Sequence, residues 1–328
     1  MKLIIQIPCY NEEESLPEAL AELPREVPGF TTVEWLIIDD GSRDETVAVA
    51  RRCGVDHVVT VPRNRGLANA FTVGIEACLE HGADVIVNTD ADNQYHAADI
   101  PALVQPILRG EAELVVGERP IADISHFSPI KKILQKLGSL MVRVVSRTDV
   151  RDAPSGFRAI SRAAAMRLNV FSEYTYTLET IIQTGQKGMA VVSVPIRVNG
   201  ETRPSRLMKS MGSYIKQSVG TMVRIFITYR PFRFFMSLGL PIFLGGAALG
   251  LRFLYHYLQG QGGGMIQSTI LAALLMGTGA FLVVVGVVVD LIAVNRKLLE
   301  KLQWKLAQLE ARQKTVADSE VGDFPAPE

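Results

Sequence analysis

Short β-rich apolar runs alternate with helical patterns along roughly the first two hundred residues. The runs LIIQIP, WLIID, HVVTV, DVIVNTD and ELVVG are predicted strands, and segments starting at Glu13, Asp44, Gly66 and Asp99 are predicted helices between them. This alternation predicts an α/β fold with a mostly parallel sheet and right-handed crossovers. Because ligands of such sheets bind beyond the carboxyl ends of the strands, the chemistry is expected directly after each run.

After about residue 200 the composition changes to one that is poor in acidic residues and rich in apolar ones, which is typical of a chain that leaves water for a membrane. Residues 202–289 contain no Asp or Glu. The whole chain has 34 basic and 34 acidic residues, and this overall balance argues for neither nucleic acid nor an acidic partner. Two long apolar segments, 234–251 and 265–289, are each about long enough to cross the roughly 30 Å hydrocarbon layer of a membrane. The alternative is a pair of helices buried in a large soluble core.

Flanking charges predict the topology of this membrane hairpin. Arg224, Arg230 and Arg233 precede the first apolar segment, and Arg296, Lys297 and Lys301 follow the second, whereas the connector 255–268 carries no Lys, Arg, Asp or Glu. The positive-inside rule then places both termini and the catalytic domain in the cytoplasm, with the chain as a multi-pass protein of the inner (plasma) membrane. Three cysteines without metal-ligand spacing or an obvious pairing also fit a reducing compartment.

Polar clusters follow the first two predicted strands. PCYNEE comes after the first, and DDGSRDET after the second, where Asp39 and Asp40 end the strand and Gly41 permits a turn. One interpretation is a turn followed by a helix cap at Ser42 or Asp44. The other is a ligand site, since a carboxylate at this edge of a sheet can accept hydrogen bonds from a ribose or a base N–H.

The segment TDADNQ closes another predicted strand with three oxygen donors, Asp90, Asp92 and Gln94. In an extended chain alternate residues share a face, so these three are expected to converge on one point. Hard oxygen ligands without nearby Cys or His suit Mg²⁺ or Mn²⁺. Taken alone such a DxD pair is often only a solvated loop, but two other acidic strand ends are expected beside it.

These segments together resemble a known family. PCYNEE, DDGSRDET, the DAD of TDADNQ, and DAPSGFR at residues 152–158 are similar to the successive motifs of family 2 glycosyltransferases of GT-A fold. The similarity is stronger to the polyprenyl-phosphate glycosyltransferases, the group that includes dolichyl-phosphate-mannose synthase. It covers roughly residues 1–230, and one branch of the group also carries a membrane hairpin.

The resemblance implies roles for individual residues. A nucleotide-sugar donor would be held by Pro8, Tyr10, Asn11, Glu12, Asp39, Asp40 and Asp90. Asp90, Asp92 and Gln94 would hold the divalent ion on the donor's pyrophosphate, and Asp92 would be catalytic in that sense. A metal between diphosphate oxygens neutralises the charge that builds on the leaving nucleotide.

The acceptor implied by the resemblance is a polyprenyl phosphate. Candidate ligands of its phosphate are Arg119, Lys132 beside Lys131 and Lys136, Ser155, Arg203 and Arg206. The alternative for the lysines is an electropositive face on anionic lipid. A phosphate oxygen is already ionised near neutral pH, so Asp152 is expected to orient the acceptor rather than act as a strong base. Ser155 and Gly156 are expected to shape the acceptor side, and Arg158 has a structural alternative.

The expected domain organisation has four parts. Residues 1–204 form the catalytic domain with an interfacial amphipathic helix at about 129–148, residues 205–233 form juxtamembrane helices, 234–293 the hairpin, and 294–328 a cytoplasmic helical tail with a disordered end. Burial inside the globular domain is the alternative for the amphipathic helices. In the tail, Leu298, Leu302, Leu306 and Leu309 suggest a short coiled coil or a helix resting on another subunit, which would make a homo-oligomer.

The predicted function is therefore metal-dependent, inverting transfer of a sugar from a nucleotide-sugar to an undecaprenyl or dolichyl phosphate at the cytoplasmic face of the membrane. The alternatives are a family 2 enzyme with another lipid or glycan acceptor, and a membrane-tethered nucleotide-binding protein without turnover.

Overall fold

The computed structural model describes residues 1–120, 129–170, 176–199, 220, 223–224, 227–260 and 266–321, with backbone alone for 129–137, 297, 300, 301 and 303–321. The chain divides into two compact units, Met1–Ser218 and Val219–Glu328.

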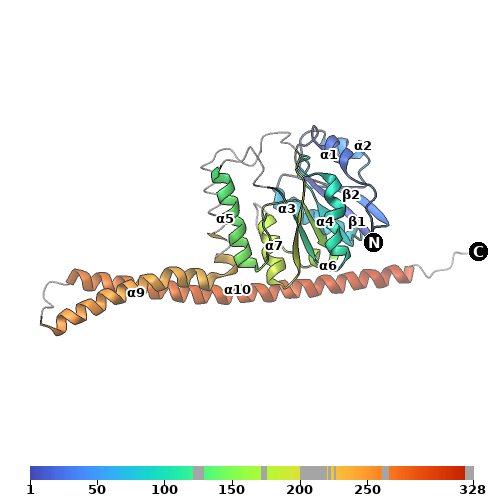
Figure 1. Cartoon of the computed structure of the whole chain (residues 1–328). Helices are drawn as coiled ribbons and strands as arrows, with labels where there is room; N and C mark the ends of the chain where they lie inside the picture. The colour runs from blue at the N-terminus through green and yellow to red at the C-terminus, as the bar shows by residue number, and fades with distance from the viewer. Residues whose placement is uncertain are drawn as a thin grey trace, which may run out of the picture. The chain divides into compact units, whose positions relative to one another are not determined.

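The first unit is built on a seven-stranded sheet (Figure 1). The strands are β1 Lys2–Cys9, β2 Thr32–Asp39, β3 His57–Thr60, β4 Val85–Asn88, β5 Leu114–Glu118, β6 Arg158–Ser161 and β7 Val191–Pro195, in the order β3-β2-β1-β4-β6-β5-β7. Among the described strands, β6 alone runs against its neighbours: it pairs antiparallel with both β4 and β5, and the other strand pairs are parallel. The predicted mostly parallel α/β fold is confirmed, and β6 and β7 are strands that the sequence patterns did not reveal.

Helices connect the strands as predicted. The four expected helices are α1 Leu16–Glu22, α2 Thr46–Arg52, α3 Leu67–Glu80 and α4 Ile100–Leu108. The described part of the unit adds η1 Ala97–Asp99, α5 Pro129–Ser146, α6 Arg162–Ala165 and α7 Thr177–Gln186.

The two faces of the sheet are covered by different helices. Leu3, Ile5 and Ile7 of β1 join a buried cluster with residues of α1, α2 and α4. On the opposite face Gln6 and Ile38 meet α3 at Gly74, where an added Cβ would lie 2.5 Å from Gln6 Oε1 and 2.7 Å from Ile38 Cδ1. Such close packing of α3 leaves no room for a larger residue, and it fixes the polar side chain of Gln6 in the interior.

The expected interfacial helix exists as α5, but one side of it packs within the unit. Val142, Val145 and Ser146 are buried, and α5 contacts α7. Leu140 and Val144 are exposed on another side of the helix. Burial within the unit therefore holds for one side of α5 among its described side chains, and an interfacial role for the exposed side stays a prediction. Most of the predicted juxtamembrane segment 205–233 lies outside the described residues.

The second unit contains the predicted hairpin as two long helices, α9 Pro231–Leu258 and α10 Ile266–Val321. Both helices contain an apolar span, Pro231–Leu258 of 28 residues and Ile266–Arg296 of 31 residues, and each span is long enough to cross a membrane. Few residues of these spans are buried, unlike those of a core helix in a soluble protein. We therefore describe them as two candidate membrane-spanning helices.

Glycines bring α9 and α10 close together along their length (Figure 1). A Cβ added at Gly246 would lie 2.7 Å from Met276 N, and one added at Gly279 would lie 2.6 Å from Phe243 N. Small residues at such positions let two backbones approach, which is how helices pack within lipid.

Candidate active site

The loops that follow β1 and β2 are hydrogen-bonded to each other. Asn11 adopts a left-handed conformation (φ 54°), its N–H donates to Ser42 Oγ (2.9 Å), and its Oδ1 accepts from the N–H of Arg43 (2.8 Å). Next along the chain, the N–H of Glu12 donates to Thr46 Oγ1 at 2.8 Å. The motifs PCYNEE and DDGSRDET therefore form two loops that hydrogen bonds join at the carboxyl edge of the sheet.

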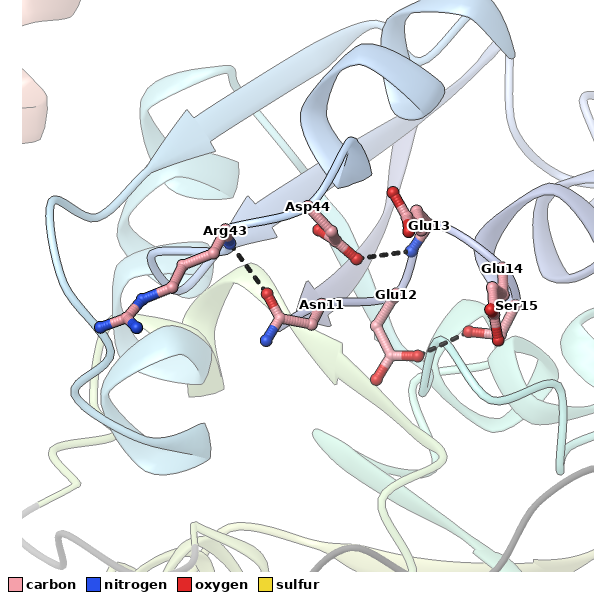
Figure 2. A pocket seen from close by; sticks show the side chains of 7 residues that line it. All are labelled: Asn11, Glu12, Glu13, Glu14, Ser15, Arg43 and Asp44. Carbon is pink, nitrogen blue, oxygen red and sulfur yellow. Dashed lines mark hydrogen bonds between the residues drawn. The ribbon is translucent and has the colours of Figure 1, made fainter.

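A pocket lies between these two loops (Figure 2). Its lining consists of Asn11, Glu12, Glu13, Glu14, Ser15, Arg43 and Asp44. Four of these side chains are carboxylic acids, against a single arginine, so the pocket would repel a diphosphate. The donor's phosphates are therefore expected elsewhere, although Asn11 and Glu12 were predicted to contact the nucleotide.

The adjacent acids Asp39 and Asp40 are both buried but differ in what they bind. Both oxygens of Asp40 accept backbone N–H bonds, from Arg65 at 2.9 Å and Gly66 at 2.8 Å, so Asp40 holds the loop that opens α3. Asp39 uses Oδ1 for the N–H of Ser42 (2.9 Å), and within the described residues its Oδ2 makes no hydrogen bond. Of this pair, Asp39 is the one with an oxygen available for a nucleotide.

The segment TDADNQ is not extended, which corrects the predicted geometry. β4 ends at Asn88, Ala91 and Asp92 form a turn, and Asn93 is left-handed (φ 53°). The turn forms because Asp92 Oδ1 accepts the N–H of Gln94 (3.2 Å), a local bond that Asp favours. Period-two alternation therefore does not bring the three predicted metal ligands together, and no described contact places the Gln94 side chain beside the two carboxylates.

Asp90 and Asp92 are nevertheless close enough to interact. Burial, followed by the charge of Asp92, raises the pKa of Asp90 to about 7, while Arg119 and Arg158 act in the opposite direction. Among the described residues, no hydrogen bond or ion pair reaches the Asp90 carboxylate. A half-buried acid beside a second acid, without a donor, is stabilised by a cation.

The donor atoms fit a hard divalent ion. In the described part of the chain no three His, Cys, Asp or Glu side chains converge on a metal position. Mg²⁺ commonly takes only one or two protein carboxylates and completes its octahedron with substrate phosphates and water. Asp90 and Asp92 meet that requirement for a metal diphosphate.

Arg119 and Asp152 form a buried two-pronged ion pair. Arg119 Nε donates to Asp152 Oδ2 (2.7 Å) and Nη2 to Oδ1 (3.0 Å), and the Arg119 backbone N–H adds a third bond at 3.2 Å. Asp152 is fully buried. Direct contact of Asp152 with an acceptor, which the sequence suggested, does not fit this placement; its carboxylate orients Arg119 instead.

Arg158 has the structural role that was its alternative. It is fully buried, and its guanidinium donates to Ser155 O (2.8 Å), Ala153 O (2.8 Å) and Thr177 O (2.7 Å), with a further bond to Thr180 Oγ1. Burial lowers its pKa to about 10, so it stays protonated near neutral pH. Arg158 thus fastens the DAPSGFR loop to the start of α7.

Polar residues that the sequence motifs did not identify hold the middle of this loop. The N–H of Gly156 donates to Tyr95 Oη (2.9 Å), and its carbonyl accepts from Asn88 Nδ2 (2.9 Å). Asn88 also donates to Tyr176 Oη (2.8 Å) and accepts from Gln6 Nε2 (2.9 Å). The available signal was the presence of Gln6 and Asn88 inside apolar strands, because buried polar groups require partners.

The remaining predicted site residues are only partly described. Pro8 is buried in β1, and Tyr10 is exposed at its end. Ser155 is fully buried, and its Oγ has no hydrogen-bond partner in the part of the chain that is described. Lys132 lies in α5 without a described side chain, and Arg203 and Arg206 lie outside the described residues. Their contacts with the acceptor stay predictions.

Comparison with known proteins identifies the family. The sequence profile described as "Glycosyl transferase family 2" matches residues 4–168, half of the chain and all four motif segments. The chain belongs to glycosyl transferase family 2. This family 2 glycosyltransferase is 32% identical over 220 residues to an undecaprenyl-phosphate mannosyltransferase of Micrococcus luteus, covering 62% of the chain and 88% of the relative. The resemblance seen in the motifs is thereby confirmed.

A second relative and a solved structure extend the comparison. The glycosyltransferase is 26% identical over 229 residues to a polyprenol monophosphomannose synthase of Mycolicibacterium smegmatis, with 66% of the chain and 84% of the relative covered. Its fold resembles that of glucosyl-3-phosphoglycerate synthase from Mycobacterium tuberculosis, solved with Mn²⁺, uridine diphosphate and glucosyl-3-phosphoglycerate (TM-score 0.53, 21% identity, 70% and 79% of the two chains). At that identity the structural likeness establishes the fold.

Proposed function

We propose that this glycosyltransferase transfers one sugar, with inversion, from a nucleotide-sugar to a polyprenyl phosphate at the cytoplasmic face of the membrane, using Mg²⁺ or Mn²⁺. The observation that carries the proposal is the joining, in one chain, of a family 2 catalytic unit to two exposed apolar helices. An acceptor that resides in the bilayer explains both parts. The names of the two relatives, an undecaprenyl-phosphate mannosyltransferase and a polyprenol monophosphomannose synthase, support the acceptor class.

The donor is held at the carboxyl edge of β1, β2 and β4. Asp39 binds the nucleoside through its available oxygen, and Pro8 and Tyr10 flank Cys9, which pairs with Asp39 between β1 and β2. Asp40 keeps the α3 loop in place. Asp90 and Asp92 hold the divalent ion, which, when bound, neutralises charge on the diphosphate leaving group. In the fold neighbour, Mn²⁺ accompanies uridine diphosphate, which supports the same pairing here.

Arg119 lies near this carboxylate pair, and its guanidinium is oriented by the ion pair with Asp152. Because its charge lowers the pKa of Asp90, Arg119 is close enough to stabilise a diphosphate bound there. It therefore fits the donor side of the reaction as well as the acceptor role predicted for it. Orientation of a guanidinium by a buried carboxylate supplies a preorganised cation at low entropic cost.

Inversion requires one displacement step. An oxygen of the acceptor phosphate forms a bond to the anomeric carbon as the bond to the donor's β-phosphate oxygen breaks, and the electron pair leaves with the nucleoside diphosphate. The acceptor oxygen is already ionised, so no strong base is required, in agreement with the burial of Asp152. Lys132, Arg203 and Arg206 remain the proposed ligands of the acceptor phosphate.

A transfer assay tests the function. The full-length protein in detergent is incubated with undecaprenyl phosphate, Mg²⁺ or Mn²⁺, and radiolabelled UDP-, GDP- or dTDP-sugars, followed by lipid extraction. Label is expected in the lipid fraction with at least one donor and not after addition of EDTA. Label transferred only to a water-soluble or non-phosphorylated acceptor would favour another family 2 activity, and nucleotide binding without turnover would favour a non-catalytic protein.

Replacement of Arg203 tests the acceptor side separately. A charge-assisted hydrogen bond to phosphate contributes roughly 1.5–3 kcal/mol, so Arg203→Ala is expected to raise the apparent KM for undecaprenyl phosphate by about one to two decades. Arg203→Lys should restore part of the loss, since it returns charge without the two-pronged geometry. Calorimetry is expected to show unchanged nucleotide affinity; weakened nucleotide binding with an unaltered lipid KM would instead assign Arg203 to the donor.

A further inference from the structure

Gly156 lies directly against the Asp90 carboxylate. A Cβ added at Gly156 would be 3.0 Å from Asp90 Oδ2, 3.2 Å from Asp90 Oδ1 and 3.0 Å from Tyr176 Oη. The backbone φ of Gly156 lies outside the left-handed region, so alanine can adopt the same conformation. What glycine supplies at this position is therefore space for the carboxylate.

The Gly156 peptide is held on both sides, so it forms a fixed wall. Tyr95 Oη accepts its N–H, and Tyr95 is itself stacked on Phe157 with ring centroids 5.2 Å apart. Asn88 Nδ2 donates to its carbonyl from the last position of β4, two residues before Asp90. The wall and the carboxylate are thus both anchored to β4, and movement of one relative to the other is restricted.

We propose that Gly156, with Tyr95 and Asn88 as positioning residues, sets the location of the Asp90 carboxylate and thereby the size of divalent ion that the site accepts. The inference rests on the proposed metal-dependent function. Mg²⁺ demands ligand distances of about 2.0–2.1 Å and near-ideal octahedral geometry, whereas Ca²⁺ accepts about 2.3–2.6 Å and irregular geometry. A displacement of Asp90 by a few tenths of an ångström therefore penalises the smaller ion more.

The test compares ion selectivity in the wild type and in Gly156→Ala. Bound Mn²⁺ is measured by electron paramagnetic resonance on the full-length protein in detergent, with uridine diphosphate and guanosine diphosphate in separate series, and is displaced by Mg²⁺ or Ca²⁺. The variant is expected to lose affinity for Mg²⁺ by roughly five- to tenfold and for Ca²⁺ by less than about twofold, because only Mg²⁺ requires the undisturbed geometry.

Gly117→Ala is the matched control. A Cβ there would crowd Ile196 Cδ1 at 2.9 Å and Phe157 Cδ1 at 3.2 Å, similar distances but against apolar atoms. This control is expected to lower the melting temperature while leaving the ratio of Mg²⁺ to Ca²⁺ affinity as in the wild type. A purely structural role for Gly156 would produce the same result in Gly156→Ala.

A second variant covers the case in which Gly156→Ala does not fold. Tyr95→Phe keeps the aromatic stack but removes the oxygen that accepts the Gly156 N–H, so a smaller shift in the same direction, about two- to threefold, is expected. An unchanged ratio in the folded variants overturns the inference and leaves the proposed function intact. Failure of the wild type to bind Mn²⁺ in either series overturns the proposed metal site, and the inference with it.

Discussion

At the scale of residues, four ionisable side chains meet in the interior beside the carboxyl edge of the sheet, and their partners differ. Arg119 and Asp152 neutralise each other, and Arg158 is satisfied by backbone carbonyls and one hydroxyl. Asp90 alone among these four has no hydrogen bond or ion pair within the described residues. An acid kept without a donor costs stability, so its retention points to a bound cation as its partner.

Replacement of the second carboxylate of the DxD pair tests that interpretation. Asp92→Asn preserves the shape of the turn but removes a charge, so kcat for sugar transfer is expected to fall by roughly two decades or more, as on loss of a key electrostatic stabiliser. Turnover is measured with and without EDTA, with Glu14→Gln on the acidic pocket as the control. Undiminished, EDTA-resistant transfer by Asp92→Asn would remove the metal from the mechanism.

A pH dependence of stability is expected at the opposite edge of the sheet. His57 and His81 stack with ring centroids 3.7 Å apart, and burial followed by the His57 charge lowers the pKa of His81. Below the unfolded pKa of about 6.5 the unfolded chain then binds more protons than the folded protein, so the free energy of unfolding should decrease as pH falls from about 7.5 to 5. Urea titrations are expected to show a shallower decrease for His81→Gln; an equal slope would contradict this origin.

At the scale of elements, the parts that could be predicted are those with strong local patterns. The strands corresponding to β1–β5, the helices α1–α4 and the two apolar spans all follow from periodicity and composition. β6 begins with the buried, charged Arg158, so its sequence does not show the apolar run by which β1–β5 were predicted. The turn at Asp92 depends on a local bond from the Gln94 N–H, for which the alternating pattern of an extended chain makes no allowance. The Arg119–Asp152 pair joins residues 33 positions apart, which spacing along the chain does not reveal.

The glycine contacts between α9 and α10 predict a position-specific sensitivity. Gly246→Val would drive a Cβ into the backbone of α10, at a cost of about 1–3 kcal/mol, whereas at Gly245 an added Cβ meets nothing within 4 Å. Reversible unfolding of the full-length protein in mixed micelles should show this loss for Gly246→Val and almost none for Gly245→Val. Equal losses for the two variants would mean that the close approach does not contribute to stability.

At the scale of the whole molecule, the proposed reaction joins a water-soluble donor to a lipid acceptor. By the positive-inside rule, the flanking arginines and lysines predict that both ends of the hairpin lie in the cytoplasm, where nucleotide-sugars are available. This predicted topology would place the short connector between the spans outside the cell.

Cysteine accessibility tests the topology. In a variant without the three native cysteines, a cysteine at Gly260 or Gln267 should be labelled by a membrane-impermeant maleimide added to intact cells, and a cysteine at Ser319 should be labelled only after permeabilisation. The reversed pattern, or protection of both positions, would show that the charge rule does not describe this hairpin.

The position of β6 has a consequence for biogenesis. β6 inserts between β4 and β5, although both are synthesised before it. A nascent chain that ends before Arg158 therefore carries two strand edges that β6 has not yet occupied, and open edges favour intermolecular pairing. The Asp90 loop also gains its Gly156 wall only at that step. Insertion of one short strand thus completes the sheet and the proposed catalytic edge together, so a product truncated before Arg158 is expected to keep both strand edges open.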